Sequence, residues 1–163
     1  MNTDNPFKPD DLAEYFIQKH TTTRRPNNPH YDLRLGRPDM GLQSWAVPKA
    51  KMPSIGEKLL AVKTPLHNYN YGGFSGILEG GYGAGKVDLV SRGKTKIVKA
   101  SPGYISFTME GETPMQYSLI KSKRNPSDWI LIGIDPSNPS SPIVKKVKSN
   151  ESNQSLRRGV PIE

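Results

Sequence analysis

The chain contains no cysteine among its 163 residues. A disulfide framework and a thiolate metal site are both excluded, so a bound metal would have to be held by nitrogen and oxygen ligands. Long apolar runs are also missing. No uninterrupted stretch approaches the roughly 20 residues that cross a bilayer, and the N-terminus shows no apolar signal segment. From these absences we expect a soluble, cytoplasmic protein with no membrane partner.

Helix signals are scarce. Only residues 10–15 could form a turn or two of helix, with Asp10 or Asp11 as the cap. Fifteen glycines and fifteen prolines interrupt an apolar content of 34%, which suits short strands joined by turns. Strand-like runs lie at 16–20, 31–35, 44–47, 59–63, 86–90, 94–99, 104–109, 117–121 and 129–134.

These runs predict an all-β protein. About eight strands in so short a chain favour a single small β-barrel, with a β-sandwich as the alternative architecture. We expect three segments: an N-terminal arm at residues 1–14, the barrel domain at 15–136 and a basic, disordered tail at 137–163. The tail is rich in Ser, Asn, Pro and Lys and has few large apolar residues, so it cannot offset the entropy lost on ordering.

The charge balance points to a polyanionic partner. The formal net charge is +8 and the sequence pI is about 9.7. Five basic and two acidic residues in the tail supply +3 of that charge. Such a surface attracts phosphate backbones, so we interpret the partner as nucleic acid, with a merely solubilising surface as the alternative.

Three residues at alternating positions carry the chemistry. His30, Asp32 and Arg34 are spaced i, i+2 and i+4, so a strand would place them on one face and the apolar residues between them on the other. A histidine and an aspartate two positions apart can share a divalent cation, and the arginine can fork onto phosphate oxygens. His20 falls on a neighbouring strand and could supply a third ligand.

Other readings of these residues stay open. The polar strand face could simply be solvated. His30 and Asp32 with the distal His67 also mimic the facial triad of non-haem iron oxygenases. A non-catalytic nucleic-acid-binding β-barrel, with Trp45, Tyr71 and Tyr82 as stacking surfaces, is a third possibility. The glycine-rich stretch at 80–85 lacks a following helical pattern, so we interpret it as a tight turn rather than a nucleotide-binding loop.

The combined motifs resemble the 3′-phosphoesterase domain of bacterial DNA ligase D. The resemblance rests on residues 16–20 (FIQKH), 30–35 (HYDLRL), 44–49 (SWAVPK) and 82–85 (YGAG), in that order. It continues through residues 60–62 (LAV), His67, Tyr71, Phe74 and Gly76 to residues 129–132 (WILI), and so covers roughly residues 15 to 135.

The resemblance implies a manganese-dependent hydrolase that resects DNA 3′ ends. Such enzymes remove a terminal ribonucleoside and then the resulting 3′-phosphate. Carried over by position, His20, His30 and Asp32 would bind the Mn²⁺. Arg34, His67 and Tyr71 would hold the scissile phosphate, and Gln18 and Lys49 would line the site.

The resemblance also implies a substrate and partners, and the chain departs from the family pattern at several positions. DNA or RNA–DNA 3′ ends would be the substrate, and we expect a monomer that meets a DNA ligase or polymerase in trans. The arm shows no clear equivalent of the charged cluster that often precedes the first strand in this family. Leu59 and Gly133 stand where family members commonly carry arginine and lysine, so the secondary phosphate contacts are thinner.

Overall fold

The computed structural model describes residues 6–81, 83–111 and 113–137. Within those ranges the fold is all-β: it has nine strands, one 3-10 helix (η1) and no α-helix. The elements are β1 (Leu12–Thr22), β2 (His30–Arg37), β3 (Gly41–Val47), β4 (Lys58–His67), η1 (Tyr69–Gly73), β5 (Gly76–Leu78), β6 (Gly85–Ser101), β7 (Tyr104–Met109), β8 (Met115–Lys121) and β9 (Asp128–Ile134). No helix in the described part of the chain is long and apolar enough to cross a membrane.

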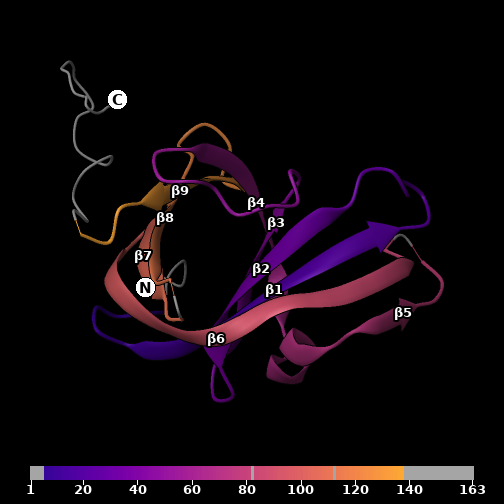
Figure 1. The fold of residues 1–163 in the computed structure, drawn as a ribbon, viewed down its shortest axis with the longest axis horizontal. Helices are drawn as coiled ribbons and strands as arrows, with labels where there is room; N and C mark the ends of the chain where they lie inside the picture. The colour runs from indigo at the N-terminus through magenta and orange to yellow at the C-terminus, as the bar shows by residue number, and fades with distance from the viewer. Residues whose placement is uncertain (1–5, 82, 112, 138–163) are drawn as a thin grey trace.

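Eight of the strands form a closed, roughly barrel-like ring (Figure 1). The order is β1-β2-β3-β4-β9-β8-β7-β6, and an antiparallel pairing between β1 and β6 closes it. The long β6 makes closure possible because its first two-thirds pair with β1 and its last third pairs with β7. β5 lies outside the ring and pairs with the start of β6. The predicted all-β, barrel-like fold is confirmed.

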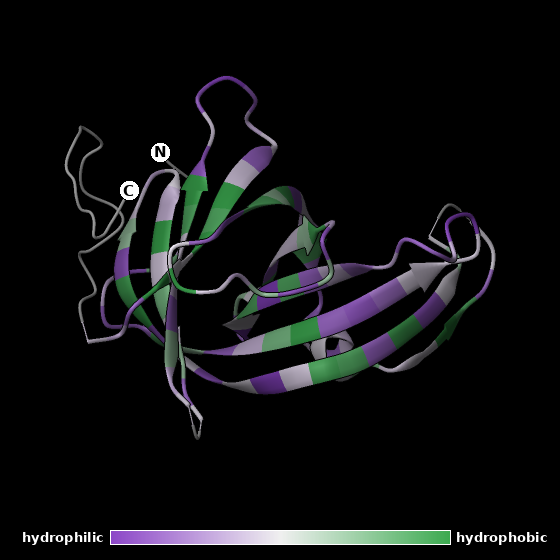
Figure 2. Ribbon diagram, turned by 45° about the horizontal axis from the view of Figure 1, so that its top comes forward, coloured by the Kyte–Doolittle hydropathy of each residue, from purple (hydrophilic) through white to green (hydrophobic). Residues whose placement is uncertain are grey.

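The apolar core lies on the inner face of the ring strands. Alternate residues of each strand point into it, including Ile17 of β1, Leu33 of β2 and Trp45 of β3, all 4% exposed or less. This alternation of hydrophobic and hydrophilic residues is visible along the ring strands in Figure 2. Burying one face of each strand fixes the register, because a slip of one residue would turn the core residues outward.

The outer face of β1, β2 and β3 is covered rather than solvated. η1 lies over it, with Gly72 so close to Phe16 that a Cβ atom there would stand 2.7 Å from the phenylalanine ring. Phe16 also meets the ring of Tyr69 edge to face, with centroids 5.7 Å apart. On this face Gln18, Arg34 and Ser44 are buried, each 3% exposed or less.

The predicted strands agree with the structure, except that two predicted strands are one and that the short elements β5 and η1 were not predicted. Residues 86–90 and 94–99 are one strand, β6, in which Gly93 leaves room for the Tyr15 ring; a Cβ atom at Gly93 would stand 2.9 Å from that ring. The register between β1 and β6 shifts at Ile17 and Gln18. Neither β5 nor η1 was predicted, because both are too short to show a periodic pattern.

The helical turn predicted at residues 10–15 is wrong. β1 begins at Leu12, because Ala13 and Tyr15 alternate into the core and pair with β6. The preceding residues also contact the ring: Phe7 is buried, and the Asp10 N–H donates to the Ile97 carbonyl at 2.7 Å. Residues 138–163, which include nearly all of the predicted tail, lie outside the described residues, and so does Tyr82.

Candidate active site

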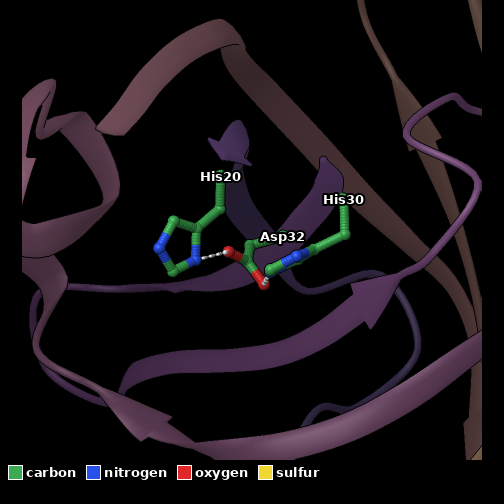
Figure 3. A group of neighbouring side chains, drawn as sticks. All are labelled: His20, His30 and Asp32. Atoms are coloured by element: carbon green, nitrogen blue, oxygen red, sulfur yellow. Dashed lines mark ion pairs between the residues drawn. The ribbon is translucent and has the colours of Figure 1, made fainter. Parts of the chain in front are cut away.

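The two histidines and the aspartate converge on the outer face of the β1–β2 pair. His20 and His30 are direct partners across the two strands, and Asp32 lies opposite Gln18, two pairs further along and so on the same face. One ligand atom from each of the three residues lies within 4.8 Å of the other two. Asp32 is buried and the histidines are partly buried. We call His20, His30 and Asp32 the triad (Figure 3).

The orientation of both rings suits a shared cation. His20 Nδ1 lies 3.8 Å from Asp32 Oδ2, and His30 Nε2 lies 3.4 Å from Asp32 Oδ1. The other nitrogen of His20, Nε2, is 2.7 Å from the carbonyl oxygen of Gly83. Donation to that carbonyl fixes the tautomer and leaves the Nδ1 lone pair facing the aspartate, as in many histidine–metal sites.

Glycine is required where the chain reaches His20 to make this contact. At Gly85 the first residue of β6 approaches β1 so closely that a Cβ atom would stand 2.1 Å from the Thr21 carbonyl oxygen. Any side chain there would push the turn, and with it the Gly83 carbonyl, away from His20. The glycine-rich stretch therefore supports His20 as a tight turn, in agreement with its interpretation from the sequence.

Arg34 extends the polar face beyond the triad. It is 3% exposed, its Nε donates to Gln18 Oε1 at 2.6 Å, and its Nη1 donates to Ser44 Oγ at 2.8 Å. Its Nη2 lies 3.6 Å from Asp32 Oδ2. Burial lowers the pKa of the guanidinium, and the negative charge of Asp32 works in the opposite direction. The result is a buried, oriented cation directly beside the triad.

An aromatic stack covers the guanidinium. The Arg34 Cζ atom lies 5.0 Å from the centroid of the Tyr71 ring, whose centroid is 5.3 Å from that of His67 and 5.4 Å from that of Phe74. Burial raises the pKa of the Tyr71 hydroxyl. Burial and then the charge of Arg34 lower the pKa of His67, whose Nδ1 lies 2.8 Å from the Pro65 carbonyl oxygen. Arg34, Tyr71 and His67, predicted to act together, do lie together.

Gln18 is the link between Arg34 and η1. It is fully buried, and its Nε2 donates to the carbonyls of Tyr71 at 2.7 Å and Phe74 at 3.1 Å while its Oε1 accepts from Arg34. Its side chain is therefore enclosed by protein groups. Its hydrogen bonds join Arg34 to the backbone around Tyr71, and its predicted place lining the site stays a prediction.

A second set of contacts holds η1 in place. The Tyr69 hydroxyl lies 2.8 and 2.7 Å from the two carboxylate oxygens of Glu14 on β1. Glu14 also pairs with Arg92 of β6 at 3.5 Å, and the Arg92 guanidinium lies over the Phe16 ring at 4.7 Å. The 3-10 helix that carries Tyr71 is thus anchored to two strands of the ring.

Lys49 lies on the turn after β3. It is exposed. The pKa of the Glu57 carboxyl is lowered first by a hydrogen bond from the Ser54 N–H, then by Lys51 and in smaller part by the charge of Lys49. The predicted place of Lys49 in the active site stays a prediction.

Sequence reasoning missed Ser44 and the Glu14–Tyr69 contact. A signal existed for Ser44, because Trp45 belongs to the core and strand alternation puts its neighbour on the face of Arg34. The Glu14–Tyr69 contact joins residues 55 positions apart and has no local pattern. This contact can be found only when the three-dimensional course of the backbone is known.

The fold and the site define a class: a small all-β protein with a His/His/Asp triad beside a buried arginine. A family model described as the DNA Ligase D 3′-phosphoesterase domain matches residues 18–121. This is more than half of the 163-residue chain, so the chain belongs to that family. No curated protein sequence matches it. The family implies a hydrolase that processes DNA 3′ ends, with a DNA end as its substrate.

The matched segment runs from Gln18 to the end of β8 and contains every residue predicted for the site. The oxygenase alternative is disfavoured by the geometry, since it needed His67 as a ligand and His20 as a bystander. The structure groups His20 with His30 and Asp32, while His67 lies against Tyr71.

Proposed function

We propose that this protein is a metal-dependent 3′-phosphoesterase with two activities. A phosphodiesterase activity removes a 3′-terminal ribonucleoside from a DNA or RNA–DNA end, and a phosphomonoesterase activity removes the 3′-phosphate left behind. One observation carries the proposal: the triad converges on the outer face of β1 and β2 directly beside the buried guanidinium of Arg34. A cation site and a phosphate-binding arginine are thereby adjacent.

The residues of the triad fit a divalent metal. Two imidazole nitrogens and one carboxylate form a donor set that suits Mn²⁺. The Gly83 carbonyl binds His20 Nε2, which leaves His20 Nδ1 free on the side of Asp32. Mn²⁺ is the cofactor we propose, because it is the metal that the family resemblance implies. When bound, such a metal supplies Lewis acidity toward phosphate oxygens and lowers the pKa of a bound water.

Arg34 has the geometry of a phosphate clamp. Gln18 and Ser44 engage one Nε and one Nη1 hydrogen, so the remaining N–H groups of the fork are available on the side of the triad. Negative charge accumulates on the non-bridging oxygens when a phosphoester is attacked, and a planar guanidinium that is already oriented stabilises this charge without reorganising.

His67 and Tyr71 complete the phosphate site in this proposal. The Pro65 carbonyl accepts the proton of His67 Nδ1, so Nε2 is the ring atom that can meet a phosphate or a leaving oxygen. Phosphate donor and general acid are both roles open to it. Tyr71, whose raised pKa keeps its hydroxyl protonated at neutral pH, can donate a hydrogen bond to the same anion.

The wider setting follows from charge and family. A net charge of +8 favours association with DNA ends, and a monomer that meets a ligase or polymerase in trans in the cytoplasm is the arrangement we propose. Gln18 and Lys49 line the site in this proposal, and the hydrogen bond from Arg34 makes Gln18 a positioning residue as well.

The test is a labelled primer strand that ends in one ribonucleotide, incubated with the full chain in the presence and absence of Mn²⁺. We expect Mn²⁺-dependent conversion first to a 3′-phosphate end and then to a 3′-hydroxyl end. Asp32→Asn should abolish both steps, whereas the matched control Asp88→Asn on β6 should retain them. DNA binding without turnover under all of these conditions would instead favour a non-catalytic nucleic-acid-binding barrel.

A further inference from the structure

An open groove of about 550 Å³ adjoins the proposed phosphate site. One wall is the β2–β3 turn, with Pro38, Met40 and Gly41, and the other is the segment from the end of β4 into η1. That second wall comprises Leu66, His67, Asn68, Tyr69 and Asn70. The volume falls within the range of about 300–1,000 Å³ that is usual for small-ligand sites.

The lining of this groove is uncharged apart from the titratable His67, although the chain carries a net charge of +8. Pro38, Met40, Leu66 and Tyr69 are the apolar and aromatic residues of the lining, and Asn68 and Asn70 are its uncharged polar residues. The Asn68 side-chain oxygen accepts from the Asn70 N–H. Leu66 is a large apolar side chain that is 56% exposed. A phosphate would find no lysine or arginine there, whereas the flat face of a nucleobase and its amide-like edge would find complementary groups.

His67 joins the groove to the phosphate site. It lines the groove on one side, and on the other its ring lies 5.3 Å from that of Tyr71, which in turn covers Arg34. The two walls are also in direct contact, because a Cβ atom at Gly41 would stand 3.1 Å from the His67 carbonyl oxygen and 3.4 Å from the Leu66 side chain. The groove therefore begins where the phosphate-binding groups end.

We propose that this groove is the subsite for the nucleoside that carries the scissile 3′-phosphate. The base and sugar lie against Leu66, Pro38 and Tyr69, and the phosphate passes His67 to reach Arg34. This assignment rests on the proposed function and adds the nucleoside contacts to it. It also explains how an enzyme with few secondary phosphate contacts distinguishes a polynucleotide end from free phosphate: the neutral groove binds the part of the substrate that phosphate lacks.

The experiment compares two constants in the same variants. A short DNA oligonucleotide ending in a 3′-phosphate serves as substrate with Mn²⁺, and inorganic phosphate serves as competitive inhibitor. We expect Leu66→Ala to raise KM about fivefold, because the exposed leucine loses apolar contact with the nucleoside. Asn70→Ala should raise KM about threefold through loss of an amide contact. The Ki of inorganic phosphate should stay within about twofold of wild type.

Leu60→Ala is the matched control, since Leu60 is also an exposed leucine on β4 but lies away from the groove. It should leave both constants unchanged. An unchanged KM in Leu66→Ala would overturn the subsite. A parallel rise in KM and Ki would also overturn it, because Leu66 would then act by displacing His67. A wild-type protein that binds phosphate but shows no phosphoesterase activity would overturn the proposed function, and the subsite with it.

Discussion

Replacing Gln18 with methionine should separate the positioning of Arg34 from the binding of metal. Methionine nearly matches glutamine in volume but makes none of its three hydrogen bonds, two to the Tyr71 and Phe74 carbonyls and one from Arg34. Neutral bonds contribute about 0.5–1.5 kcal/mol each and a bond to a charged group about 1.5–3 kcal/mol. Allowing for the apolar burial of methionine, we expect the free energy of unfolding to fall by about 3 kcal/mol, or roughly 10 °C in Tm.

The same change should lower kcat. Without Gln18 the Nε of Arg34 has no acceptor and η1 loses two anchoring bonds, so the guanidinium and the Tyr71 ring shift relative to the triad. A displacement of about 1 Å at such a site can cost about 100-fold in rate, so we expect a loss between tenfold and 100-fold. Mn²⁺ affinity should change by about twofold or less, because Gln18 belongs to no part of the triad.

Thermal unfolding, metal titration and turnover of a 3′-phosphate end measure these three quantities. Gln116→Met is the matched control: Gln116 is also a buried glutamine, but within the described part of the chain its side chain makes one hydrogen bond, to Ser106 on β7. It should cost about 1 kcal/mol and leave kcat unchanged. The reasoning is refuted if Gln18→Met melts within about 3 °C of wild type, or if both glutamine variants lose turnover equally.

Other changes test the remaining parts of the site. Alanine at any one position of the triad should abolish diesterase and monoesterase activity and weaken Mn²⁺ binding while the fold, followed by circular dichroism, survives; near wild-type activity with metal bound would remove that residue from the ligand set. Arg34→Lys should lower turnover at least 100-fold with metal affinity nearly unchanged, and equal turnover would end its assignment as the clamp. Burial lowers the pKa of His67, so if catalysis needs His67 protonated, kcat/KM should fall as pH rises through that lowered pKa. In the substrate complex the bound phosphate favours protonated His67, so kcat should fall at a higher pH than kcat/KM does. His67→Gln should remove both of these decreases. Deleting residues 138–163 should weaken DNA binding in a salt-dependent way and leave kcat intact, and a truncated chain that binds normally but turns over poorly would contradict this.

Local pattern predicted much of this protein. Strands are readable from alternation, and the spacing of His30, Asp32 and Arg34 on one strand was enough to place three side chains on one face. Pairing across the sheet was harder to foresee, since it depends on where the β1–β2 turn falls. The register of the two strands brings His20 opposite His30. The contacts of the core and the contacts of the site both require this register.

The contacts made through η1 could not be predicted. A five-residue 3-10 helix has no periodic signature, yet it supplies the Tyr71 ring and one carbonyl that binds Gln18, and its C-cap Phe74 supplies the other. The reason for glycine at position 133, where family members commonly carry lysine, also became clear only from the structure. A Cβ atom there would stand 2.2 Å from the Ser54 carbonyl, so the crossing of the segment before β4 leaves no space for a side chain.

The pairing of His20 with His30 has a consequence for how this protein can vary. These two residues form the last pair of the β1–β2 ladder, and the loop that joins the strands begins beyond them. The distances within the triad are set by strand pairing and core packing on the near side of that pair, and by the Gly83 carbonyl that binds His20. Thr23 donates to the Ala84 carbonyl, next to the Gly83 carbonyl that binds His20, and Arg25 donates back to Thr22. Residues 26–29 are therefore the part of the loop that can be lengthened, shortened or exchanged at little thermodynamic cost without moving a ligand atom. That loop is a natural place for lineages to acquire new contacts with a nucleic acid end, and for an engineer to insert a tag or a second domain.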